Sequence, residues 1–132
     1  MIKFVNKNIN PKGKKTGDCV VRALALATDR EYLDVYSELF YLSIKSGYIL
    51  SDKRVVERFL LNHGFVKHKQ PKKNKRKYRV AELDELCSDK VIVVSCAHHL
   101  TVVIEGVLTD IWDCRGKCIS NYYTKGETKN EK

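Results

Sequence analysis

The feature that most restricts the fold is a run of ten residues, Cys19–Thr28 (CVVRALALAT), that is apolar at nearly every position. Arg22 is its one charged residue, and Asp18, which precedes the run, is of a residue type that often begins helices. A helix that is apolar on all sides is stable only where protein surrounds it. The run therefore predicts a central, buried helix against which the rest of the chain packs.

The chain is long enough to supply that surrounding protein. Its 132 residues fit one domain, and a domain of this size buries roughly two-thirds of its surface on folding. Two further helices are expected, over residues 29–46 and 52–62, because each shows helical periodicity and is followed by a glycine. The first of them carries an apolar stripe formed by Leu33, Tyr36, Phe40 and Ile44.

The second half of the chain changes to strand patterns. Strands are expected over 91–96, 100–104, 107–112 and 117–123, and Glu105-Gly106 predicts a tight turn between the second and the third. The predicted class is therefore α+β, with N-terminal helices, the central one buried, packed on a C-terminal antiparallel sheet. We expect one domain over residues 1–124 and a polar tail over 125–132.

Cysteine usage and hydropathy indicate the compartment. The five cysteines are an odd number, and Met1–Asn10 has no apolar core suited to a signal peptide. No apolar run approaches the roughly 20 residues that a membrane span needs. We therefore expect a cytoplasmic protein with reduced thiols and no membrane association. Burial, metal binding and catalysis remain as roles for the cysteines.

The net charge of +9 is concentrated in one stretch. Lys67–Arg79 (KHKQPKKNKRKYR), here called the basic segment, holds eight of the 25 Lys and Arg residues and no acid, so the rest of the chain carries 17 basic residues against 16 acidic ones. We expect a solvated loop. Its functional interpretation is a contact with nucleic-acid phosphates or with an acidic protein, through Lys72, Lys73, Lys75, Arg76 and Lys77.

Cys19 is a candidate nucleophile because of its place in the predicted helix. The first turn of a helix has unpaired backbone N–H groups and the positive end of the helix dipole, and both stabilise an anion. Such a position lowers the pKa of a thiol toward the nucleophilic thiolate. The neighbouring carboxylate of Asp18 acts in the opposite direction, so a nearby imidazolium is needed to outweigh it.

The hairpin around Glu105-Gly106 supplies two candidate bases. With a two-residue turn, His99 and Asp110 fall on one face of the hairpin, and His98 and Asp113 fall on the other. An imidazole beside a carboxylate on a neighbouring strand is an oriented general base. The register allows one dyad or the other, and the sequence leaves both open.

A Cys that opens a buried helix, followed much later by a His and an Asp on neighbouring strands, resembles the papain-like cysteine peptidases. The matching segments are Gly17–Ala23 (GDCVVRA), His99–Thr101 (HLT) and Asp110–Asp113 (DIWD). They are similar to bacteriocin-leader peptidases and to small papain-like proteins of phages and bacteria, over most of the chain.

The resemblance implies a papain-like fold and a cysteine hydrolase that cleaves a peptide, isopeptide or other amide bond. It implies Cys19 as nucleophile, His99 as base and Asp110 as the residue that orients His99. It also implies a peptide or protein substrate, no cofactor, and a location in the cytoplasm of a bacterial or phage-infected cell.

One position departs from the family. Papain-like enzymes carry an oxyanion-binding Gln about six residues before the Cys, and that position here is Gly13. No Gln precedes Cys19, and Asn10 is the nearest amide side chain for this role. The departure leaves a second interpretation open: a catalytically inactive papain-like binding module that contacts nucleic acid or an acidic protein through the basic segment.

The other cysteines allow a rival site. Cys114 and Cys118 form a Cys-x3-Cys pair, and Cys96 and His98 lie near the open end of the hairpin. Three thiolates and one imidazole are a ligand set that binds zinc tetrahedrally. This zinc site is kept as an alternative to the expectation of no metal.

Overall fold

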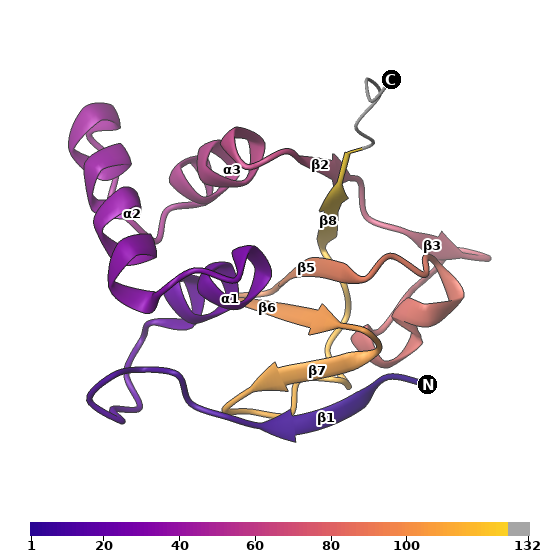
Figure 1. Ribbon diagram of the computed structural model, residues 1–132. Helices are drawn as coiled ribbons and strands as arrows, with labels where there is room; N and C mark the ends of the chain where they lie inside the picture. The colour runs from indigo at the N-terminus through magenta and orange to yellow at the C-terminus, as the bar shows by residue number, and fades with distance from the viewer. Residues whose placement is uncertain (127–132) are drawn as a thin grey trace, which may run out of the picture.

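A six-stranded sheet organises the computed structural model, which describes residues 1–126 (Figure 1). A separate two-stranded hairpin, β3–β4, accompanies it. In chain order the elements are β1 (Lys3–Asn6), α1 (Cys19–Thr28), α2 (Tyr32–Ser46), α3 (Lys53–Asn62), β2 (Phe65–His68), β3 (Lys72–Lys73), β4 (Arg76–Lys77), the 3-10 helix η1 (Val80–Glu85), β5 (Val91–Cys96), β6 (His99–Ile104), β7 (Val107–Asp110) and β8 (Asn121–Lys125).

The sheet is mixed, with the strand order β1-β7-β6-β5-β8-β2. Neighbouring strands run antiparallel except β1, which pairs in parallel with β7. The α+β class is thus confirmed, but the prediction of a purely antiparallel, C-terminal sheet is wrong. Both edge strands, β1 and β2, come from earlier in the chain. Each has four residues, too few for a clear alternation, and its pairing depends on segments distant in the sequence.

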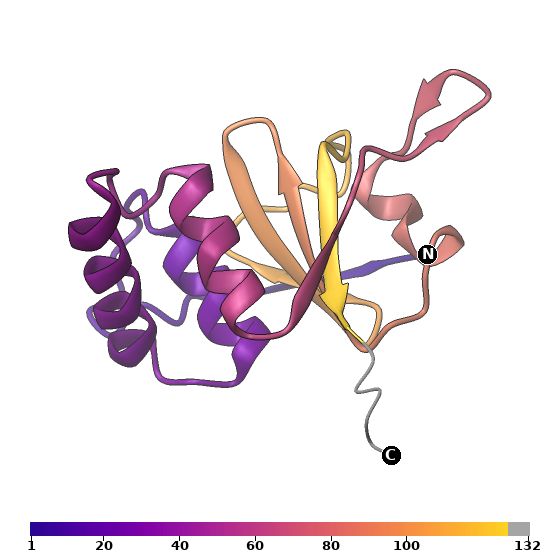
Figure 2. The same ribbon diagram turned by 90° about the horizontal axis from the view of Figure 1, so that it is seen from above.

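Two hydrophobic clusters cover the two faces of the sheet. The larger lies between the sheet and the helices α1, α2 and α3, and its fully buried members include Leu24, Leu39, Phe59 and Val102. The smaller lies under η1 and includes Val80, Leu83 and Leu108. Figure 2 shows the resulting layers, with the three helices on one side of the sheet and η1 on the other. Burial of both faces explains why β5 is a nearly continuous apolar run.

The buried central helix is confirmed as α1, in which seven of ten residues are buried. Asp18 occupies the N-cap position, as expected, but its side chain accepts no capping hydrogen bond from the helix. Its two carboxylate oxygens are instead bonded to Arg22, Asn10 and Tyr32. The side-chain interactions of Asp18 therefore hold α1 to its surroundings instead of closing its first turn.

The apolar stripe predicted for the second helix does not face the core. Leu33 and Ile44 are each 65% exposed, and Tyr36 and Phe40 are also exposed. The side chains of α2 that are buried are Val35 and Leu39. The helix therefore packs along a narrow seam, because apolar periodicity identifies a helix face but not whether protein covers it.

The basic segment is more ordered than the expected loop. Its first residues belong to β2, which pairs with β8, and the rest forms the short hairpin β3–β4. Figure 2 shows this hairpin projecting from the side of the sheet that faces away from α1–α3. At the other boundary, β8 extends through Lys125, the first residue assigned to the polar tail, while 127–132 lie outside the described residues.

Within residues 1–126, no helix has the length and hydropathy that a membrane crossing requires.

Candidate active site

The β6–β7 hairpin places His99 and Asp110 next to each other. Glu105 and Gly106 both have a positive φ (50° and 79°), as a two-residue turn requires, and Val103 pairs with Leu108 in the expected register. With this register, His99 begins β6 and Asp110 ends β7. The His99 Nε2 atom lies 2.8 Å from Asp110 Oδ2.

The Asp110 carboxylate is buried and surrounded by donors. Its Oδ2 accepts a 2.7 Å hydrogen bond from Thr101 in addition to the contact with His99. Its Oδ1 accepts from Arg22 at 3.0 Å and from the backbone N–H of Ile111 at 2.7 Å. Burial alone would raise the pKa of Asp110, but the hydrogen bonds from His99, Thr101 and Arg22 lower it to about 2. The residue is therefore a carboxylate at any physiological pH.

Cys19 is the first residue of α1, where the chain turns from the loop into the helix. Its half-buried thiol lies close enough to the imidazole of His99 and to the backbone N–H of Leu100 for both groups to stabilise the thiolate. Burial raises the pKa of Cys19, but the contacts with these two groups and the charges of His99 and Arg22 outweigh it, so the pKa lies below that of a free thiol. The imidazole of His99 thus interacts with both the Cys19 thiol and the Asp110 carboxylate.

His99 is largely buried and interacts with the groups on either side of it. Burial would lower the pKa of this imidazole, but hydrogen bonds with Asp110, Cys114 and Cys19 raise it to about 11. The ring of Trp112 packs edge-on against it, with 4.8 Å between the ring centres. Trp112 is 46% exposed, so it covers the imidazole from the solvent side. Together these contacts favour an imidazolium paired with a thiolate.

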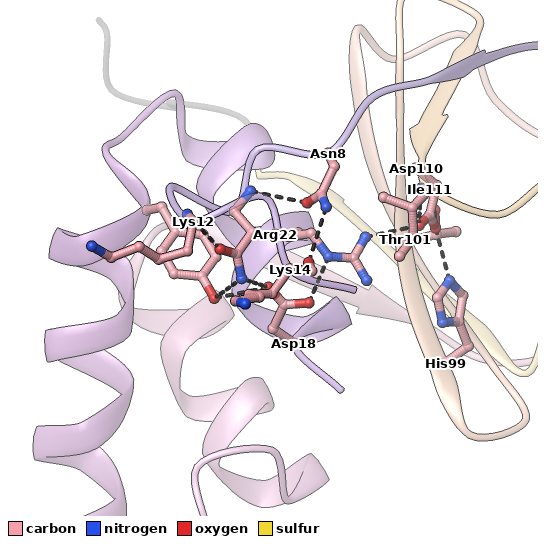
Figure 3. Close-up of polar contacts among 11 residues, drawn as sticks. Asn8, Lys12, Lys14, Asp18, Arg22, His99, Thr101, Asp110 and Ile111 are labelled. Atoms are coloured by element: carbon pink, nitrogen blue, oxygen red, sulfur yellow. Dashed lines mark hydrogen bonds and ion pairs between the residues drawn. The ribbon is translucent and has the colours of Figure 1, made fainter. Parts of the chain in front are cut away.

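Arg22 is the important residue that the sequence interpretation missed. Its guanidinium lies between two carboxylates, 2.8 Å from Asp18 Oδ1 and 3.0 Å from Asp110 Oδ1 (Figure 3). It therefore neutralises Asp18, which was expected to oppose ionisation of Cys19. The signal was present: a lone charge in an apolar helix needs a buried partner, and Arg22 follows Cys19 by three positions and so shares its helix face.

The structure does not bring Asn10 to the thiol. The amide nitrogen of Asn10 donates to Asp18 at 2.9 Å, and its amide oxygen accepts from the backbone of Lys12. Its role is to fix the loop before α1, and it has no free donor for an oxyanion. The sequence could not reveal this, because the partner of an amide in a loop depends on how the loop folds.

The other proposed dyad is not assembled. His98 is exposed and occupies the turn between β5 and β6 with a φ of 57°. Asp113 is also exposed, and both of its carboxylate oxygens bond to Arg115. The register therefore selects His99 with Asp110 from the two pairs that the sequence allowed.

The alternative zinc site is not assembled either. Cys118 and His98 are exposed, whereas Cys96 and Cys114 are buried. Burial raises the pKa of Cys96 to about 12, which opposes the thiolate that zinc requires. Within residues 1–126 the one cluster of potential metal ligands is His99, Asp110 and Cys114, whose ligand atoms lie within 4.8 Å of one another. The Arg22 guanidinium on the same carboxylate opposes a cation there.

A cleft of about 430 Å³ opens in front of Cys19. It is lined by residues of α1, α3, the β5–β6 hairpin and β8: Gly17, Cys19, Val20, Ser51, Lys53, Val56, Ser95, Cys96, His98, His99, Leu100 and Tyr123. No Asn or Gln side chain is among them. The cleft gives a substrate access to the sulfur and to the imidazole from the same side.

The five basic residues proposed for binding, Lys72, Lys73, Lys75, Arg76 and Lys77, lie in the hairpin β3–β4, and none of them lines this cleft. All are exposed. Arg76 and Lys73 form ion pairs with Glu82 and Glu85 of η1. The basic hairpin is thus a surface separate from the thiol.

No family model matches the chain, and no curated protein or solved structure matches it. The relation to papain-like peptidases therefore stays a prediction from the three sequence segments.

Proposed function

We propose that the protein is a papain-like cysteine hydrolase that cleaves a peptide, isopeptide or other amide bond. One observation carries the proposal: His99 lies 2.8 Å from the buried Asp110 carboxylate and close enough to Cys19 to lower the pKa of its thiol, and Cys19 and His99 both line an open cleft. A thiol of lowered pKa, a cationic imidazole and a buried carboxylate are the three parts that nucleophilic acyl transfer requires.

The reaction begins with the Cys19 thiolate. The sulfur bonds to the carbonyl carbon of the scissile amide, and the electron pair of the C=O bond moves to the oxygen. His99 gives its proton to the amine as the C–N bond breaks, which leaves a thioester on Cys19. Water, deprotonated by His99, then attacks the thioester and releases the acid and the free thiolate. Asp110 keeps the imidazole oriented and stabilises its positive charge throughout.

The oxyanion is stabilised by the backbone in this proposal. The N–H groups in the first turn of α1, including that of Cys19, have no acceptor within the helix. They carry the positive end of the helix dipole, which favours a developing negative charge. No side-chain amide of the cleft assists them, since Asn10 is bonded elsewhere. We therefore expect a slower enzyme than one with a complete oxyanion hole, because one such donor contributes roughly 10²–10³-fold in kcat.

Alkylation rates test the thiolate–imidazolium pair. Cys118 serves as the internal control because it is an exposed thiol far along the chain from Cys19. We expect iodoacetamide at pH 6 to modify Cys19 at least about ten times faster than Cys118, since an unperturbed thiol is less than about 1% ionised there. The modified residue is identified by mass spectrometry of the digested protein.

The same measurement on His99→Gln shows whether fast alkylation of Cys19 is caused by the imidazole or only by exposure of the thiol. Loss of the cation raises the pKa of Cys19, and its alkylation at pH 6 then slows to a rate near that of Cys118. Equal rates for the two cysteines in the native protein would contradict the proposal. Bond cleavage itself is sought by mass spectrometry of a mixed peptide library, with Cys19→Ser as the inactive control.

A second candidate function uses the basic hairpin. Lys72, Lys75 and Lys77 form no ion pair within residues 1–126, and the hairpin projects from the body of the protein (Figure 2). Such an arm suits a contact with phosphates that is independent of base sequence. Binding to a labelled DNA duplex is measured at several salt concentrations, before and after Lys72, Lys75 and Lys77 are replaced by Ser. Unchanged binding excludes the arm as the contact.

A further inference from the structure

The cleft in front of Cys19 carries an unbalanced positive charge. None of its lining residues is acidic, and Lys53 is its one lysine or arginine. Lys53 begins α3, and the β5–β6 hairpin contributes Ser95 and His98 to the same lining. Within residues 1–126 its ammonium group forms no ion pair, although two carboxylates lie close enough to feel its charge.

Both of those carboxylates are occupied by other cations. Asp52 is bonded to Arg54 through both carboxylate oxygens, at 2.9 Å each, and also accepts from the Arg54 backbone at 2.8 Å. Glu57 lies 2.6 Å from the ammonium group of Lys67 and accepts a hydrogen bond from Tyr123. Within residues 1–126 neither acid forms an ion pair with Lys53, which belongs to the lining of the cleft.

The walls around Lys53 fit a side chain with an apolar stem and a polar end. Val20, Val56 and Leu100 supply apolar surface, and the hydroxyls of Ser51 and Ser95 supply hydrogen-bond donors. A carboxylate at the end of one or two methylene groups matches the positive charge of Lys53, the hydroxyl donors and the apolar surface of this lining. An ammonium or guanidinium group would face both Lys53 and the imidazolium of His99, and like charges in one cleft repel.

We infer that Lys53 is a specificity-determining residue and that the cleft selects substrates with a carboxylate beside the scissile amide. This inference rests on the proposed function, because it names the substrate class of the same site. The carboxylate has two possible sources, a Glu or Asp side chain or the free C-terminus of a peptide.

Matched peptides distinguish these sources. The probes are capped hexapeptides that carry Glu, Gln or Lys at a central position, together with an uncapped peptide that ends in a free carboxylate. We expect kcat/KM for the Glu peptide to exceed that for the Gln peptide by about five-fold, the effect of one partly exposed ion pair. If only the uncapped peptide is favoured, the C-terminus is the source of the carboxylate.

Variants at Lys53 test the residue itself. Lys53→Met keeps the length of the side chain and is expected to remove the preference for Glu mainly by raising KM for the Glu peptide. Lys53→Glu is expected to reverse the order, so that the Lys peptide becomes preferred. Lys3→Met, on the exposed β1 strand, is the matched control and should leave the preference unaltered. An equal fall in kcat for all peptides, or a persisting Glu preference in Lys53→Met, overturns the inference.

Binding to an inert variant separates this inference from the proposed function. In Cys19→Ala the peptides cannot be cleaved, so their dissociation constants are measured by calorimetry. Tighter binding of the Glu peptide that disappears in Cys19→Ala/Lys53→Met supports the role of Lys53 even if no bond cleavage is ever found. Cleavage without any dependence on charge leaves the hydrolase standing and overturns the role of Lys53.

Discussion

Replacement of Arg22 by methionine tests how α1 is held to the sheet. Arg22 is buried, and its guanidinium bonds to Asp18 on its own helix and to Asp110 on β7. Methionine is similar in length, suits a helix and matches the apolar neighbours of Arg22. The substitution therefore removes the positive charge and its hydrogen bonds while leaving little empty volume.

The expected cost follows from the two carboxylates that remain. Removal of one partner of a buried ion pair costs about 3–5 kcal/mol, because an uncompensated charge stays buried. Asp18 keeps Asn10 and Tyr32 as donors, and Asp110 keeps Thr101 and His99, so the lower end of that range applies. With an unfolding entropy of about 2.1 cal/mol/K per residue, a loss of about 3 kcal/mol lowers the Tm of this chain by about 11 °C.

Urea unfolding followed by far-ultraviolet circular dichroism at pH 7 measures this loss. The control is Arg22→Met combined with Asp18→Asn, which removes one unpaired charge and is expected to recover part of the lost stability. The deficit of the single variant is also expected to shrink as pH falls, because protonation of Asp18 and Asp110 removes the uncompensated charge. A single variant within about 1 kcal/mol of the native protein, or no recovery in the double variant, would falsify the reasoning.

Two further predictions concern the same region. The pKa of Asp110 is depressed to about 2 in the folded protein, so this carboxylate contributes about 2 kcal/mol to the free energy of unfolding above pH 4. This contribution is lost as pH falls toward 2. We expect the urea midpoint of the native protein to fall over this range, and that of Asp110→Asn to fall less. Equal pH dependence in the two proteins would contradict this. Gly106→Ala forces an L-residue into a φ of 79° and is expected to lower the free energy of unfolding, measured in urea, by about 1 kcal/mol. Gly116→Ala is the control, because φ is not positive there and no atom lies within 4 Å of the added carbon. Equal stabilities of the two variants would show that the turn tolerates the side chain.

Features encoded by neighbouring residues were predictable from the sequence. The buried helix α1 follows from one apolar run, and the pairing of β6 with β7 follows from a two-residue turn at Glu105-Gly106. That register alone brings His99 and Asp110 onto one face, and it places them within hydrogen-bond distance. This part of the site geometry could be predicted because a short loop determines the register of the two strands that it joins.

Features that depend on distant contacts were not predictable. The apolar residues of α2 have the correct helical spacing, but whether protein covers them is decided by how α1 and α3 pack. The parallel pairing of the edge strand β1 with β7 joins segments far apart in the chain, and no local sequence pattern predicts it. Asn10 was assigned to the oxyanion on proximity in sequence, and its bond to Asp18 shows that loop conformation sets the partner of an amide.

The pairing of β1 with β7 also affects when the site can form during folding. Residues 3–6 must meet 107–110, and Cys19 must meet His99, across most of the chain. The β6–β7 hairpin can close within microseconds, but loop closure over such separations is slower and is opposed by chain entropy. In a partly folded chain Cys19 therefore lacks the imidazole that lowers its pKa, and the thiol is an ordinary, weakly reactive one. The rate at which the Cys19 thiol becomes reactive after dilution from denaturant therefore reports the rate at which the sheet is completed.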